Sequence, residues 1–182
     1  MATSVAYFAE RLKSLLRFRD LLILLLFILN GCAPRPTNTP KPTPTSLPST
    51  IAEAHDVLVD FFALLNAGKY AEADALYGGS YEGLWDNNPI VDQSDHAKLL
   101  ANACEINGYQ CLLVRTATFK LLQGSTYIFQ VEFNNADGTL FVPGPCCGAN
   151  ETEMPPVSQF EYRVSMTAPG KFTVMDLPPY VP

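Results

Sequence analysis

The sequence has little of what usually carries catalysis or nucleic-acid binding. Its 182 residues include two histidines and one tryptophan, and only 16% of them are charged. It contains no G-x-S-x-G nucleophile motif, no H-E-x-x-H metal motif, no phosphate-binding glycine loop and no pair of carboxylates at a fixed spacing. The formal net charge of −6 disfavours a phosphate backbone as partner. We therefore expect no catalysis, no cofactor, no bound metal and no nucleic-acid partner.

The sequence also lacks a hydrophobic run long enough for a transmembrane helix. Leu21–Leu29 is uncharged over only nine residues, whereas a span needs roughly 20. Basic residues precede this run at positions 11, 13, 17 and 19, and Gly31 and Cys32 follow it. A basic segment, a short apolar run and a small residue before cysteine together resemble a bacterial lipoprotein signal peptide that ends in the lipobox Leu29-Asn30-Gly31-Cys32. Asn30 is less usual at its position than a small residue.

The resemblance to bacterial lipoproteins implies a localisation. Residues 1–31 would be removed, and Cys32 would carry a diacylglyceryl group and often a further acyl chain such as palmitate. Two or more chains give stable anchoring, whereas one gives only marginal binding. We therefore expect a protein of the cell envelope, held by lipid on the extracytoplasmic side of a bacterial membrane. Without residues 1–31 the chain loses four basic and two acidic residues, so its net charge becomes about −8.

Residues 32–50 are predicted to be the lipidated cysteine and a linker. Residues 33–50 contain six prolines and five threonines, a composition that cannot bury enough apolar surface to fold. In extended polyproline conformation 18 residues would reach up to about 55 Å. Residues 51–182 are then predicted to form a single folded domain.

Helices are predicted in the first part of this domain. Thr50-Ile-Ala-Glu53 has the form of a capping box, and an apolar stripe at helical spacing follows it and ends at Gly68, which suits a left-handed cap. A second helix is expected over Tyr70–Tyr77. A third is expected to start at Ser94 and to end near Asn107-Gly108.

Strands are predicted in the second part. Residues 127–133 and 159–166 alternate between apolar and polar side chains, as half-buried strands do. Residues 112–122 and 171–177 are predicted as two further strands, with Pro169-Gly170 in a type II turn between the last two. Three helices followed by four mainly antiparallel strands predict an α+β fold with the helices on one face of the sheet.

The segment Val57–Tyr77, VLVDFFALLNAGKYAEADALY, resembles the opening helical hairpin of NTF2-like (SnoaL-like, cystatin-like) domains. In that superfamily three helices and a curved sheet enclose a conical pocket. The resemblance rests on packing residues, so it implies the fold and not the activity. Three hypotheses follow: a binding module for a small hydrophobic molecule or an envelope protein, without catalysis; an isomerase- or hydratase-like enzyme in the cone; and a structural envelope protein that forms a homodimer through its sheet.

Four cysteines follow Cys32: Cys104, Cys111, Cys146 and Cys147. An even number in an exported domain favours disulfides. A bond between the neighbours Cys146 and Cys147 would need a strained ring, so we expect each of them to bond to Cys104 or Cys111. A zinc site of four thiolates is the alternative, but these spacings do not match the usual ones.

Aromatic residues are the candidates for ligand or partner contact. Tyr81 and Trp85 lie in a loop-like segment at the predicted rim of the cone, and Tyr127 and Tyr162 lie on the apolar faces of predicted strands. The alternative is structural: Trp85 would close the end of a small core, and the two strand tyrosines would be core residues.

Overall fold

The computed structural model describes residues 48–182. The predicted signal peptide of residues 1–31, the lipidation site Cys32 and all but the end of the linker lie outside the described residues. Within residues 48–182, no helix combines the length and the apolar character that a membrane crossing requires.

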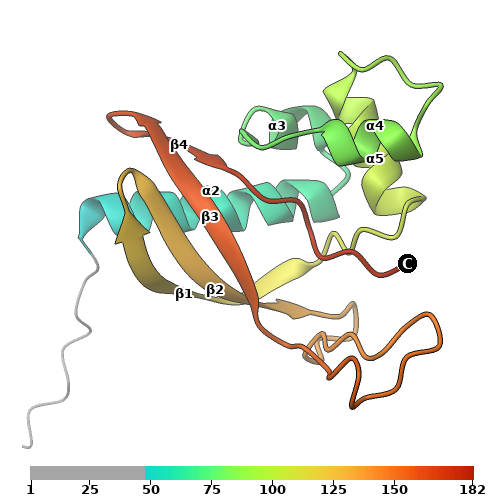
Figure 1. Cartoon of the computed structure of the whole chain (residues 1–182). Helices are drawn as coiled ribbons and strands as arrows, with labels where there is room; N and C mark the ends of the chain where they lie inside the picture. Colours follow the sequence, from blue (N-terminus) through green and yellow to red (C-terminus); the bar gives the residue numbers. More distant parts are fainter. Residues whose placement is uncertain (1–47) are drawn as a thin grey trace, which may run out of the picture. The chain divides into compact units, whose positions relative to one another are not determined.

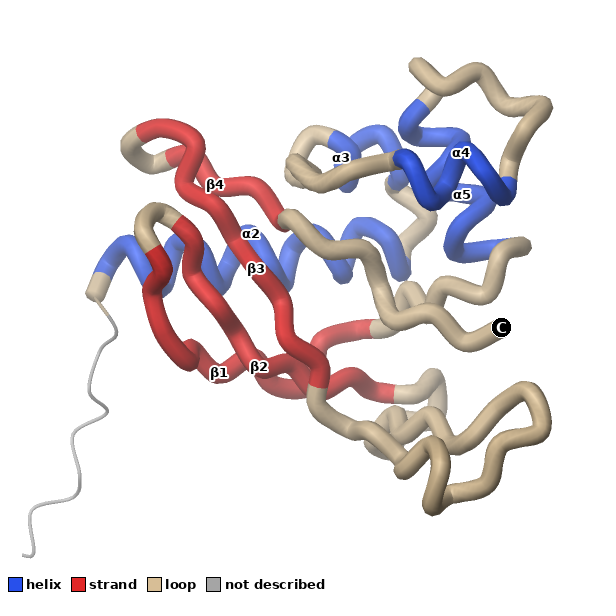
Figure 2. The backbone as a smooth tube through the Cα atoms, viewed as in Figure 1, coloured by secondary structure: helices blue, strands red, loops and turns tan. Residues whose placement is uncertain are grey.

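The described part of the chain has an α+β fold, as the sequence predicts. The helices come first, followed by the strands (Figures 1 and 2). The elements, in order, are α2 (Ser49–Asn66), α3 (Tyr70–Asp74), α4 (Glu82–Asn87), α5 (His96–Glu105), β1 (Leu113–Gln123), β2 (Thr126–Asn134), β3 (Phe160–Ala168) and β4 (Lys171–Val174). The short helix α4 was expected to be a loop, so the prediction of three helices is not confirmed.

The four strands form one sheet in the order β1-β2-β3-β4, with every neighbouring pair antiparallel. Gly170 in the turn between β3 and β4 has φ +70°, which agrees with the predicted type II turn. β4 ends at Val174 and is therefore shorter than the predicted strand of residues 171–177. Beyond it, the side chain of Asp176 accepts a hydrogen bond from the backbone nitrogen of Arg163 at 2.7 Å, which replaces a strand-to-strand bond.

Two predicted helix starts are wrong by one or two residues. α2 begins at Ser49 after Pro48 and has no side-chain cap, so the capping box of Thr50 and Glu53 is not formed. α5 is capped by Asp95, whose carboxylate accepts a hydrogen bond from the backbone nitrogen of Lys98 at 3.0 Å. Pro48 has no side-chain oxygen that could cap α2. The carboxylate of Asp95 caps α5 by accepting a backbone N–H, and it also interacts favourably with the helix dipole.

The core lies between α2 and one face of the sheet. α2 lies along this face (Figure 1) and buries its predicted apolar stripe of Ala54, Leu58, Phe61, Phe62 and Leu65. The ring of Phe62 lies 4.8 Å from that of Phe133 on β2 and 5.0 Å from that of Tyr162 on β3, edge to face in both cases. Side chains therefore fill the space between helix and sheet.

The C-terminal segment lies against the connection between α5 and β1. The backbone nitrogen of Gln110 donates to the carbonyl of Pro179 at 2.8 Å, and that of Val181 donates to the carbonyl of Gly108 at 3.0 Å. Gly108 has φ +82°, a conformation that favours glycine. These bonds hold the α5–β1 connection in place beside the end of α2.

Candidate functional site

The only disulfide within residues 48–182 joins Cys104 to Cys111. The chain turns back directly after α5, where the backbone nitrogen of Tyr109 donates to the carbonyl of Ala103 at 3.1 Å. This turn brings the two cysteine Cα atoms to 5.5 Å, within the usual range for a disulfide. The expected pairing of these cysteines with Cys146 and Cys147 is therefore wrong. The turn after α5 brings Cys104 and Cys111 together, so neither of them is bonded to the loop that contains Cys146 and Cys147.

Cys146 and Cys147 are the unbonded pair among the described residues. They lie in the connection between β2 and β3, with 2.7 Å between their Sγ atoms. The hydrogen bond with Cys147 raises the pKa of the Cys146 thiol above its ordinary value. The four cysteines are thus divided between a disulfide and a separate pair of thiols. They do not form the four-thiolate zinc site that was the alternative.

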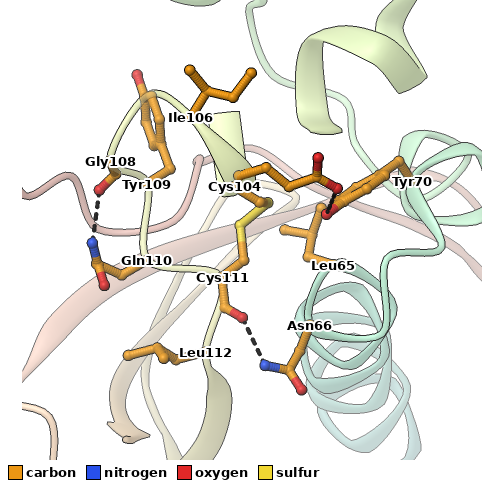
Figure 3. A pocket seen from close by; sticks show the side chains of 11 residues that line it. Leu65, Asn66, Tyr70, Cys104, Ile106, Gly108, Tyr109, Gln110, Cys111 and Leu112 are labelled. Atoms are coloured by element: carbon orange, nitrogen blue, oxygen red, sulfur yellow. Dashed lines mark hydrogen bonds between the residues drawn. A yellow bond between two sulfur atoms is a disulfide. The ribbon is translucent and has the colours of Figure 1, made fainter. Parts of the chain in front are cut away.

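A surface pocket of about 430 Å³ lies over the Cys104–Cys111 disulfide (Figure 3). The end of α2, the start of α3, the end of α5 and the connection to β1 contribute to it. Its lining residues are Leu65, Asn66, Tyr70, Cys104, Glu105, Ile106, Gly108, Tyr109, Gln110, Cys111 and Leu112. The disulfide fixes two of these elements, α5 and the segment before β1, relative to each other.

Three side-chain donors in the pocket bond to acceptors within the protein (Figure 3). The hydroxyl of Tyr70 donates to Oε1 of Glu105 at 3.0 Å. Nδ2 of Asn66 donates to the carbonyl of Cys111, and Nε2 of Gln110 donates to the carbonyl of Gly108, both at 2.9 Å. These bonds leave acceptors available on the lining residues: Oε2 of Glu105, Oδ1 of Asn66 and Oε1 of Gln110. The pocket is therefore rich in acceptors and carries one carboxylate.

Two tyrosines line the pocket, Tyr70 beside Glu105 and Tyr109 beside Tyr180. Partial burial raises the pKa of Tyr70, and the hydrogen bond to Glu105 adds a smaller effect in the same direction. Partial burial raises the pKa of Tyr109, and the nearby Tyr180 adds a smaller effect in the same direction. The rings of Tyr109 and Tyr180 lie 5.2 Å apart. Both pocket tyrosines are therefore neutral at physiological pH.

The structure does not bring the four predicted contact residues to one opening. Tyr127 and Tyr162 are 4% and 3% exposed. The ring of Tyr127 packs on Phe172, and the hydroxyl of Tyr162 donates to the carbonyl of Leu177 at 3.3 Å. Burial raises the pKa of Tyr162 well above its ordinary value. Both residues are part of the core, as the structural alternative predicts.

Tyr81 and Trp85 lie together at α4, away from the pocket. Trp85 is half-buried and packs against the core, and its indole Nε1 has no hydrogen-bond partner among the described residues. The Tyr81 hydroxyl donates to Oδ1 of Asp74 at 2.5 Å, and its ring stacks on that of His96 with centroids 4.0 Å apart. Burial, and then the bond to Asp74, raises the pKa of Tyr81. Tyr81 is thus a weaker acid than a free tyrosine, and its contacts join α3, α4 and α5.

The pocket is also lined by residues that were not predicted from the sequence: Tyr70, Glu105, Tyr109 and Gln110. Their signal was the glycine at position 108 between two cysteines that are seven positions apart. A glycine there allows a tight reversal and a local disulfide, which would have placed residues 105–110 at the surface around it. The spacing was weighed only as a metal motif.

No protein-family model matches the chain, and no curated protein and no solved structure was found to be similar to it. The class of protein is therefore the one that the fold defines: an α+β domain in which the helix α2 lies along one face of a four-stranded antiparallel sheet and the other helices pack on α2 or on one another. The site adds a polar, acceptor-rich pocket beside a disulfide. The likeness to NTF2-like domains stays a prediction from the sequence.

Proposed function

We propose that this protein is a lipid-anchored extracytoplasmic binding module without catalysis, and that its pocket at the Cys104–Cys111 disulfide binds a small cation with N–H donors, such as a primary amine. The observation that carries the proposal is the lining of the pocket. Of its donors, the Tyr70 hydroxyl and one N–H each of Asn66 and Gln110 are engaged by Glu105 Oε1 and by the carbonyls of Cys111 and Gly108. Free acceptors remain for a ligand that brings donors.

The chemistry of the pocket suits an ammonium group. A carboxylate gives a charge-assisted hydrogen bond, which is stronger than a neutral one. The ring of Tyr70, next to this carboxylate, favours a cation close to its face through cation–π attraction, which contributes about 0.5–2 kcal/mol depending on exposure. The excess of acidic over basic residues in the chain also attracts cations over longer distances.

The pocket is a better candidate than the interior of the predicted cone for a small molecule. Phe61, Phe62, Phe129 and Phe133 are fully buried between α2 and the sheet. They occupy the volume in which a small hydrophobic ligand would lie in an open cone. We therefore replace the expected hydrophobic ligand by a polar, cationic one at the surface pocket.

Isothermal titration calorimetry tests this proposal on the full chain in a mild non-ionic detergent. Butylamine, butanol and butyrate have similar size and differ in charge and donors, so we expect butylamine to bind and the other two not to bind. We expect Glu105→Gln to weaken amine binding by about tenfold, the equivalent of 1.4 kcal/mol. Glu82→Gln on the exposed start of α4 is the matched control and should bind the amine like the wild type. Equal binding of the three probes, or no effect of Glu105→Gln, would refute the proposal.

The anchor is tested separately by Cys32→Ser. We expect the wild type to incorporate labelled palmitate and to sediment with membranes when it is produced in a bacterium with lipoprotein processing. Cys32→Ser should lose the label and no longer be cleaved after Gly31. Equal labelling of the two proteins would show that Cys32 is not the lipidated residue.

One observation favours the alternative in which the domain forms a dimer through its sheet. β1 is an outer strand that pairs only with β2 among the described residues, and Leu121 and Leu122 on it are 43% and 52% exposed. An unpaired edge with apolar side chains is a common site of association. Sedimentation velocity distinguishes the cases: a dimer that Leu122→Lys dissociates would support this alternative, and a monomer over the whole concentration range would exclude it.

A further inference from the structure

The connection between β2 and β3 places two neighbouring thiols in contact. Cys146 and Cys147 are the unbonded cysteines of residues 48–182, and their Sγ atoms lie 2.7 Å apart. Because the S–S distance of a disulfide is about 2.05 Å, the two atoms need to approach by only about 0.7 Å to form one. Cys147 is exposed and Cys146 is partly exposed, so a reagent in solution can reach the pair.

The backbone of this loop brings the two side chains together. Neighbouring side chains of an extended chain point in opposite directions, but Cys147 has a left-handed conformation with φ +60°, and Gly148 follows with φ +90°. Cys147 is the only residue other than glycine with a positive φ in residues 48–182. The backbone nitrogen of Ala149 donates to the carbonyl of Cys146 at 3.0 Å and closes the turn. Such a conformation at a cysteine is sparsely populated and persists where the surrounding structure enforces it.

From this geometry we propose that Cys146 and Cys147 are a redox-active pair, which closes reversibly to a disulfide by exchange with a disulfide compound R–S–S–R. One cysteine attacks this compound as its thiolate, forms a mixed disulfide and releases one R–SH. The second cysteine then attacks the protein sulfur of the mixed disulfide, forms the Cys146–Cys147 bond and releases the other R–SH. The two cysteines lose two electrons and two protons, and the two released thiols take them up.

The strain of a ring between neighbouring residues makes the exchange reversible. A disulfide usually joins Cα atoms that are about 4.4–6.8 Å apart, whereas those of neighbouring residues are only about 3.8 Å apart. Strained or exposed disulfides are more easily reduced than structural ones. The Cys104–Cys111 bond, with its Cα atoms 5.5 Å apart, is an unstrained reference in the same chain. We therefore expect the pair to be reduced without a disulfide compound, as it is in the structure.

Titration with glutathione redox buffers tests this proposal. The protein is the full chain in non-ionic detergent with Cys32→Ser as background, and the probe is glutathione disulfide at a range of ratios to reduced glutathione. Acid quenching and alkylation follow, and mass spectrometry counts the free thiols and any bound glutathione. We expect two free thiols per chain in reduced glutathione and none in glutathione disulfide. No glutathione should remain bound, and Cys104–Cys111 should stay closed throughout.

Variants assign the bond. Cys146→Ser and Cys147→Ser each leave one thiol of the pair, so each variant should keep one glutathione as a mixed disulfide that no neighbour can release. Cys104→Ala/Cys111→Ala is the matched control and should close the Cys146–Cys147 bond at the same glutathione ratio as the background protein. Circular dichroism of each variant in the far ultraviolet verifies that the fold is unchanged.

The same titration in urea measures the contribution of the loop geometry. In the unfolded chain nothing holds Cys147 in its left-handed conformation, which costs free energy to adopt. We therefore expect the equilibrium constant for closing the Cys146–Cys147 bond to be at least about tenfold lower in urea than in the folded protein.

Four results would overturn the proposal. Two free thiols or a bound glutathione in the presence of glutathione disulfide would show that the pair does not close. Linked dimers on a non-reducing gel would show that these thiols bond between chains. Reduction of Cys104–Cys111 at a lower glutathione concentration than Cys146–Cys147 would contradict the strained bond. Equal closure in the folded and the unfolded chain would show that the loop geometry plays no part.

Discussion

The Cys104–Cys111 disulfide gives the sharpest prediction about stability. The double variant Cys104→Ala/Cys111→Ala opens a loop whose ends are seven positions apart. The chain-entropy relation for a loop of about eight residues gives a loss of about 2.5 kcal/mol in the free energy of unfolding at 25 °C. The perturbation also releases the end of α5 from the segment before β1, so amine binding in the adjacent pocket should weaken as well.

The control is the double variant Cys146→Ala/Cys147→Ala. These residues are unbonded and partly or fully exposed, so the free energy of unfolding should change by less than about 0.5 kcal/mol. The expected pairing from the sequence makes a different prediction. Two bonds that each close a loop of about 40 residues would contribute about 4 kcal/mol each, and the second double variant would then be as destabilised as the first.

Urea unfolding followed by circular dichroism measures both variants against the wild type, without reductant. Mass spectrometry of the unreduced, unfolded chain is an independent measure: the structure predicts a deficit of two protons, whereas two disulfides would give four. Equal destabilisation of the two double variants, together with a deficit of four, would refute the pairing in the structure.

Three further predictions concern the core and its edges. Phe62→Ala should cost about 3–5 kcal/mol because the ring is fully buried against β2 and β3; thermal unfolding measures this loss, and a change below 1 kcal/mol would contradict the packing. Asp176→Ala should lower the free energy of unfolding by about 1–2 kcal/mol. It removes the hydrogen bonds of this carboxylate with the guanidinium and the backbone nitrogen of Arg163, on a half-exposed surface. An unchanged urea midpoint would refute this role. Burial raises the pKa of Tyr162 in the folded protein above the ordinary value near 10, so the contribution of this residue to the free energy of unfolding should be constant below about pH 10 and fall as the pH rises above it. The loss of stability above pH 10 in urea titrations should be less steep in Tyr162→Phe, and identical slopes would exclude this residue as a cause.

The fold could be predicted to a large extent because its signals are local and periodic. The stripe on α2 and the alternation along β2 report burial on one face, whichever partner covers that face. The predicted strands at 112–122, 127–133 and 159–166 differ from β1, β2 and β3 by at most a few residues. Gly68 has the predicted left-handed conformation, with φ +71°.

The errors lie where a tertiary contact competes with a local pattern. Thr50 and Glu53 can form a capping box, but the helix already begins before them. The segment around Trp85 has few helix signals, but packing against the core and against α5 makes it the short helix α4. β4 ends early because the carboxylate of Asp176 takes over the bond that a strand would make.

The sequence by itself determined the order of helices and strands, their buried faces and the acidic charge, because each depends on spacing or composition alone. Only the tertiary structure decided which cysteines are bonded and where the surface pocket lies. Cys104 and Cys111 meet because the chain reverses at Gly108. The pocket exists because that turn lies against the end of α2, with Glu105 and Tyr70 from different helices sharing a hydrogen bond. The contact between Tyr70 and Glu105 joins residues 35 positions apart, so it depends on how whole helices pack and not on a local pattern.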